Sequence, residues 1–206
     1  MGFDALYQAI PGDFPLVELA RRDRGMGEWL SSLPWLLQDP RVESLAPGEP
    51  EPGELRLLEL SKELSRARPD LATRQVLLHR RWDHLHFVLS ARRREAPDAE
   101  DGSLARIAIR GETEIAPHVV AGQGVPLRFT RPETVKDIAR MLDALHLEPL
   151  RTHFTFERLT QAHVYKCPSE DAVEADWEWL REHFEQFRAF HATAAAHGDG
   201  VLVRID

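Results

Sequence analysis

The C-terminal part of the chain carries a hydrophobic pattern that is satisfied by one long helix with a buried face. Trp177, Leu180, Phe184, Phe187 and His191 follow one another at steps of three or four residues. At 3.6 residues per turn these side chains line one side of a helix. A continuous aromatic face of this kind is usually part of a core. We therefore expect this helix to pack its aromatic side against the rest of the fold.

Alternating apolar residues predict strands over residues 3–10 and 201–205, because successive side chains of a strand point to opposite faces. Gly198 to Gly200 supply the stop between the long helix and the last strand. A chain of 206 residues with 43% apolar composition is large enough to bury a core without disulfides. We predict an α/β fold, with α+β as the alternative, in which helices surround a mixed sheet.

One segment cannot form regular structure. Residues 46–53 contain three prolines and two glycines, which break any helix or strand ladder. Too little chain precedes this segment to make a domain by itself. We therefore expect an exposed Pro/Gly/Glu-rich loop at 46–53 within a single domain that spans residues 1–206.

Two helices are expected in the middle of the chain. Between His79 and Ser90 the residues Trp82, Leu85, His86 and Leu89 have the spacing of one helical face. Further on, Thr130 and Glu133 have the spacing of a capping box, in which each side chain bonds the backbone amide of the other residue. This pattern predicts that a helix begins there.

Net charge and composition disfavour several classes of protein. Lys and Arg total 26 against 34 for Asp and Glu, a net charge of −8, so we expect no nucleic-acid partner. No stretch approaches the roughly 18 consecutive apolar residues of a membrane span, and no secretory signal is visible. The single cysteine, Cys167, excludes an intrachain disulfide. We expect an acidic cytoplasmic protein without membrane contact.

The block from Arg81 to Ser90 resembles the W-D-x-L-H-F-x-L signature of the YfbM-like family, a group of uncharacterised bacterial proteins. Further landmarks fall in the family's order: Gly111, the run 126–135, the run 150–154, and Val164 with Tyr165. The C-terminal helix and strand match as well. The resemblance implies a compact α/β domain with helices around a mixed sheet, and it carries no assigned activity.

The chain departs from the family pattern in two places. The resemblance covers the opening strand and the chain from about Leu77 onward, so residues 29–73 read as an insertion. The family's Tyr-Pro pair is split here into Tyr165-Lys166-Cys167-Pro168. The second departure puts in doubt any role that depends on that turn.

The histidines near this block are candidates for metal ligands and for catalytic groups. On a helix, His84 and His86 lie about 200° apart around the axis and cannot share one ion, so we expect no metal site and no cofactor. His86 lies on the apolar face beside Trp82, where an imidazole needs a hydrogen-bond partner. This position favours a structural role for His86, with a role as acid or base as the alternative.

Two functions from different classes follow. The first is an interaction protein, for example an immunity or regulatory partner of a basic toxin or enzyme. It is motivated by the charge of −8, the acidic residues at 170–178 and the lack of a catalytic set. Trp179 is out of phase with Trp177, so we expect it to be exposed and suited to anchoring a protein partner.

The second function is an enzyme of unknown reaction. In this hypothesis Trp82, His86, Gln123 and Tyr165 surround a cleft, with His86 as the acid or base and Asp83 among the binding residues. The sequence does not predict an oligomeric state, a substrate or a partner.

Overall fold

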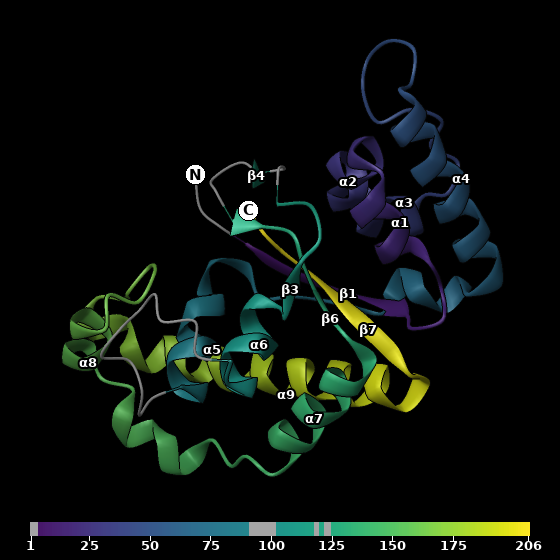
Figure 1. The fold of residues 1–206 in the computed structure, drawn as a ribbon. Helices are drawn as coiled ribbons and strands as arrows, with labels where there is room; N and C mark the ends of the chain where they lie inside the picture. The colour runs from purple at the N-terminus through teal and green to yellow at the C-terminus, as the bar shows by residue number, and fades with distance from the viewer. Residues whose placement is uncertain (1–3, 91–101, 118–119, 122–124) are drawn as a thin grey trace.

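The computed structural model describes residues 4–90, 102–117, 120–121 and 125–206, and its centre is a sheet with helices around it (Figure 1). The strand order is β2 (Gln75–Leu77), β1 (Ala5–Pro11), β7 (Asp199–Ile205), β6 (Arg128–Thr130) and β3 (Thr113–Glu114). All four pairings are antiparallel. A second, small ladder joins β4 (Val120–Ala121) to β5 (Val125–Pro126). The predicted sheet surrounded by helices is confirmed, with antiparallel rather than mixed strand directions, so α+β describes the fold best.

The two ends of the chain form the middle of the sheet. β1 and β7 pair over seven residues, from Ala5 opposite Ile205 to Pro11 opposite Asp199. Nearly every residue of both strands is buried. The Tyr7 hydroxyl donates a hydrogen bond to the Ile109 carbonyl at 2.8 Å, which satisfies the one polar atom that this buried ring carries. Both strands expected from alternation are present.

Helices lie on both sides of the sheet (Figure 1). The N-terminal group consists of α1 (Leu16–Arg22), α2 (Arg24–Trp29), η1 (Leu30–Ser32), α3 (Leu33–Gln38), α4 (Pro52–Ala67) and η2 (Pro69–Thr73). The later group consists of η3 (His79–Arg81), α5 (Trp82–Leu89), α6 (Leu104–Arg110), α7 (Pro132–Asp143), η4 (Glu148–His153), α8 (Phe156–Gln161), η5 (Glu170–Ala172) and α9 (Val173–His197). Because these two groups of helices lie on opposite sides of the sheet, the side chains on both faces of β1 are buried.

The long C-terminal helix is α9, of 25 residues. Its predicted aromatic face is confirmed, since Trp177, Leu180, Phe184 and Phe187 are each at most 2% exposed. Burying side chains of this size stabilises the fold by roughly 1.5–3 kcal/mol each before ordering costs. α9 ends at Gly198, whose φ of 69° lies in the left-handed region that favours glycine.

The segment 46–53 is shorter as a loop than predicted. α4 already begins at Pro52, because proline at the first helical turn lacks only an amide hydrogen that would have no partner there. Gly53 is buried, and a β-carbon on it would lie 2.2 Å from the Gly25 carbonyl carbon, so α2 and α4 pack at close range. The Glu54 carboxylate holds the preceding turn by accepting from Leu45 N–H. The predicted insertion over residues 29–73 stays a prediction.

Two helix predictions need correction in detail. α5 forms where expected, but it is buried on nearly all sides, because seven of its eight residues are buried and Leu89 is half-buried. The capping box at Thr130 is absent, because Thr130 is the last residue of β6 and Arg131 is the N-cap of α7. Glu112 serves this helix end instead, and its carboxylate accepts from Arg131 N–H at 3.1 Å.

In the described part of the chain, no helix combines the length and apolar character required to cross a membrane.

We predict that His191 makes stability depend on acid. Burial lowers the pKa of His191 to about 4, while its Nδ1 lies 3.0 Å from the Phe187 carbonyl oxygen. Between pH 6.5 and 4 the unfolded chain binds a proton that the folded chain excludes, so stability is lost as pH falls, by about 3 kcal/mol in total. In urea unfolding from pH 7 to 4.5, His191→Phe should have a shallower loss of stability than wild type. The same substitution at exposed His146 should keep the wild-type slope, and equal slopes for all three proteins would contradict the prediction.

Candidate functional site

Several residues singled out in the sequence come together around α5. His86 Nδ1 lies 3.4 Å from Asp83 Oδ1, and Asp83 Oδ2 accepts the Tyr165 backbone N–H at 2.8 Å. The Trp82 and Tyr165 rings stack with centroids 6.1 Å apart. Trp82, Asp83 and His86 are all less than 9% exposed. Gln123 lies outside the described residues. The cluster joins the α5 helix to the turn at residues 162–168.

A second buried polar group was missed by sequence reasoning. Asp176 is 5% exposed, and it lies between Arg81 Nη2, at 2.8 Å from its Oδ1, and His84 Nε2, at 3.6 Å from its Oδ2. Burial lowers the pKa of the His84 imidazole, although the Asp176 and Asp83 carboxylates oppose this shift. Asp176 precedes Leu180 by four residues, so helical spacing could have assigned it to the buried face of α9.

These titratable groups do not form a cluster of metal ligands. Within the ranges that the structure describes, no group of three or more His, Cys, Asp or Glu side chains is placed to hold an ion. His84 and His86 both belong to α5 and are both buried, but their partners are different carboxylates.

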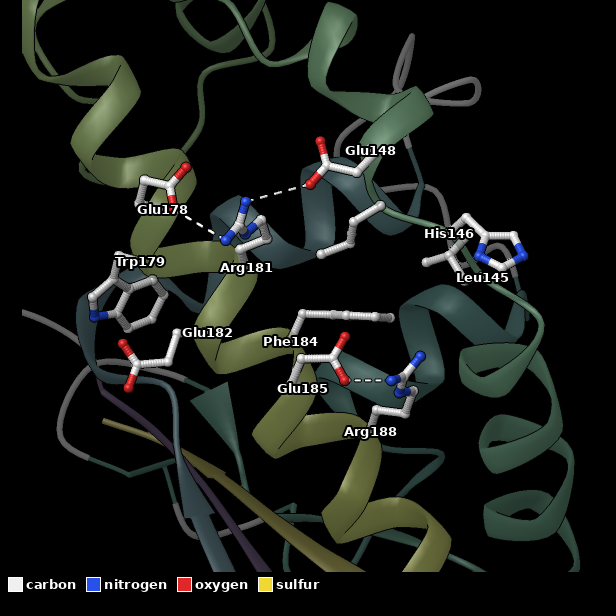
Figure 2. A pocket seen from close by; sticks show the side chains of 11 residues that line it. Leu145, His146, Glu148, Glu178, Trp179, Arg181, Glu182, Phe184, Glu185 and Arg188 are labelled. Carbon is white, nitrogen blue, oxygen red and sulfur yellow. Dashed lines mark hydrogen bonds and ion pairs between the residues drawn. The ribbon is translucent and has the colours of Figure 1, made fainter.

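The outer side of α9 forms a groove with the segment that follows α7 (Figure 2). The groove has a volume of about 790 Å³. Its lining combines an apolar floor with charged walls: Leu145, Leu147, Trp179 and Phe184 on the floor, and His146, Glu148, Glu178, Arg181, Glu182, Glu185 and Arg188 around it. We call this feature the α9 groove. It lies beside the buried aromatic face of α9, and Phe184 belongs to both.

Both arginines of the α9 groove are already engaged by its glutamates. Arg181 lies between Glu148 and Glu178, with a nitrogen 3.5 Å from an oxygen of each (Figure 2). Arg188 pairs with Glu185 in the same way. Exposed pairs of this kind contribute little to stability. Their consequence is electrostatic, because four carboxylates against two guanidinium groups leave the groove net negative.

Glu182 differs from the other glutamates of the α9 groove. Among the described residues it forms no ion pair, and it accepts only a hydrogen bond from Gln186 Nε2 at 3.5 Å. In Figure 2 its carboxylate lies below the Trp179 ring, on the helix turn that both residues share. Glu182 is therefore a carboxylate of the groove that is free to pair with an incoming cation.

Trp179 is less exposed than the sequence predicted. The indole is half-buried, stacks on His183 with ring centroids 3.6 Å apart, and has the Arg81 guanidinium carbon 5.3 Å from its ring centroid. Such contacts with a cation and a second ring hold the indole in place. Trp179 contributes a fixed apolar surface to the groove rather than a freely projecting anchor.

We predict that Asp83 stabilises the fold through its two contacts. Asp83→Ala should lower the free energy of unfolding by about 1–3 kcal/mol, because it leaves the part-buried Tyr165 N–H without its acceptor. Asp83→Asn should cost less, since an amide oxygen still accepts that bond. Urea unfolding measures both, with Asp143→Ala at the exposed end of α7 as the control, expected within about 0.5 kcal/mol of wild type. An Asp83→Ala protein as stable as the control would refute the assignment.

Comparisons with known proteins place this fold in a family. No curated protein sequence matches the chain. Among solved structures, the chain is similar to the crystal structure of YfbM from Escherichia coli, a protein of unknown function, with a TM-score of 0.56 and 16% identity over 98% of this chain and 99% of that chain. At this identity the likeness concerns the fold alone. A family model described as a domain of unknown function matches residues 42–204, and the chain therefore belongs to the DUF1877 family.

Proposed function

We propose that the protein is a binding module whose α9 groove receives a basic segment of another protein. The observation that carries this proposal is the free carboxylate of Glu182 beside the fixed indole of Trp179, within a groove that is net negative. A lysine or arginine of the partner would pair with Glu182. An apolar side chain next to it would cover Leu145, Leu147 and Trp179.

The charge of the whole molecule supports the same reading. A net charge of −8 attracts a basic partner over about a Debye length and raises the rate of encounter. Charge complementarity of this kind contributes more to specificity and association rate than to affinity. An immunity or regulatory partner of a basic toxin or enzyme needs fast and specific association. We propose this class of role for the protein.

The groove has the size and composition of a small recognition site. A volume of about 790 Å³ takes a few side chains of a peptide rather than a whole domain surface. Its apolar floor lies inside a rim of charged residues, as in protein interfaces where a central apolar contact is surrounded by polar groups. We therefore expect the occupant to be a short helix or extended segment with basic and apolar residues in alternation.

A second candidate function is an enzyme in which His86 acts as acid or base. It is favoured by one contact, the 3.4 Å approach of His86 Nδ1 to Asp83 Oδ1, because a carboxylate beside an imidazole orients the ring and stabilises its charged form. Asp83 also bonds Tyr165 N–H, so the same contact serves the packing of the fold. This second role of Asp83 is why binding in the α9 groove remains our preferred proposal.

The proposal predicts selective binding of a basic peptide. The probe is a short synthetic peptide of alternating lysine and leucine, compared with its glutamate–leucine counterpart. We expect the basic peptide to shift the Trp179 indole resonance in NMR titrations, and Glu182→Lys to weaken its affinity about tenfold. Trp179→Phe assigns the resonance.

The matched control is Glu63→Lys, the same charge change on the exposed side of α4. If the basic peptide merely responds to net charge, Glu63→Lys and Glu182→Lys weaken binding equally, and the proposal fails. It also fails if the acidic peptide binds as tightly as the basic one.

A further inference from the structure

A second pocket, separate from the α9 groove, lies at the N-terminal end of α9. It has a volume of about 470 Å³ and is formed where α9 meets the start of β1, η3 and the turn before Pro168. Its titratable lining consists of Asp4, His79, Arg80, Arg81, Lys166 and Asp176. We call it the Arg80 pocket. Cationic side chains gather here although the protein as a whole is acidic.

The Arg80 pocket retains positive charge after its internal pairing. Asp176 offsets Arg81, with 2.8 Å between the two groups. Within the described ranges, Arg80 and Lys166 form no ion pair, and Lys166 Nζ lies 5.9 Å from the centroid of the Tyr165 ring. Asp4 is the remaining carboxylate of the lining. Two free cations against one free carboxylate leave the pocket attractive to an anion.

The N-terminal end of α9 also lies at this pocket. Ala172 is the N-cap of the 25-residue α9 and lines the pocket, and no side chain caps it. The N-terminal end of a helix carries a partial positive charge and favours anions. Glu174 and Asp176 in the first turn of α9 oppose this contribution, so the attraction for an anion rests on Arg80 and Lys166.

The rear wall of the pocket is fixed from inside the protein. Asp176 faces His84, which is fully buried and whose two ring nitrogens form no hydrogen bond in the described structure. Buried polar atoms without partners are uncommon in native structures. Arg81 Nη2 lies 2.8 Å from Asp176 Oδ1, and this pairing offsets the charge of the Asp176 carboxylate next to an anion bound at Arg80.

Backbone strain is concentrated at this pocket. The described part of the chain has three non-glycine residues with positive φ, and two of them, His79 at 39° and Lys166 at 54°, line the pocket. A left-handed backbone costs a side-chain-bearing residue free energy, and such positions gather at ligand sites. Lys166 therefore combines a strained backbone with a place in the lining of the pocket.

We propose that the Arg80 pocket binds the oxyanion group of a small ligand, a phosphate or a carboxylate, through Arg80 and Lys166. Both groups bind a charged oxygen by charge-assisted hydrogen bonds, which are about twice as strong as neutral ones. The volume of the pocket leaves room for the remainder of a small molecule beyond the anion. This proposal does not depend on the peptide proposed for the α9 groove.

Calorimetric titration of the full chain tests the proposal with inorganic phosphate, acetate and chloride at constant ionic strength. We expect saturable binding of phosphate or acetate, with chloride silent, and the preferred anion identifies the chemical source. Arg80→Gln and Lys166→Gln should each weaken that binding about fivefold or more. Lys136→Gln, at an exposed lysine of α7, is the matched control and should change nothing.

A further variant separates binding from folding. Lys166→Gly should raise the melting temperature, because glycine adopts positive φ without cost, and it should weaken anion binding at least as much as Lys166→Gln. The proposal is overturned if chloride binds as well as phosphate and acetate, if the control variant weakens binding equally, or if Lys166→Gly binds the anion like wild type.

Discussion

Burial of the aromatic face of α9 is the interaction on which the rest of this structure depends. The helix packs against the sheet and α7, and its Phe187 ring meets Tyr7 of the central strand edge-to-face, with centroids 5.0 Å apart. Because that inner side is committed to the core, the orientation of the helix is fixed. This orientation places the glutamates of the α9 groove and Asp176 at the N-terminal end in defined positions. Both proposed sites follow from this one packing arrangement.

Arg81 physically connects the two sites. Its guanidinium group lies 5.3 Å from the Trp179 ring centroid, at the edge of the α9 groove, and bonds Asp176, in the wall of the Arg80 pocket. Because Arg81 contacts both Trp179 and Asp176 on neighbouring turns of α9, it restrains both side chains. Arg81 and Asp176 therefore lie between the acidic groove and the basic pocket.

The sequence predicted those features that rest on periodicity. The strands at both ends, the aromatic face of α9, the α5 helix and the glycine stop at Gly198 all depend on local spacing, and all are present. The direction of the strands depends on tertiary pairing, which periodicity does not encode. The N-cap of α7 was also assigned wrongly, because Thr130 belongs to β6 and the Arg131 N–H is bonded by Glu112, nineteen residues away.

The candidate sites were predictable only in part. Trp179 was identified from its phase on the helix, and Asp83 and Tyr165 from the family resemblance. The bond between them spans 82 residues, and no pattern in one sequence specifies such a contact. Arg80 and Lys166 gave no signal, because each is an ordinary surface cation until the fold brings η3 beside the turn at residues 162–168. The left-handed backbone that orients Lys166 is likewise a product of tertiary structure.

The central claim, that Glu182 pairs with a cation of a bound segment, is tested most directly by a charge-swap cycle. Binding is measured for wild type and Glu182→Lys, each with the lysine–leucine peptide and with a version in which one lysine at a time is replaced by glutamate. The account predicts one peptide position at which the glutamate restores much of the affinity lost in Glu182→Lys, which is the signature of a direct pair. Additive losses at every position would contradict it.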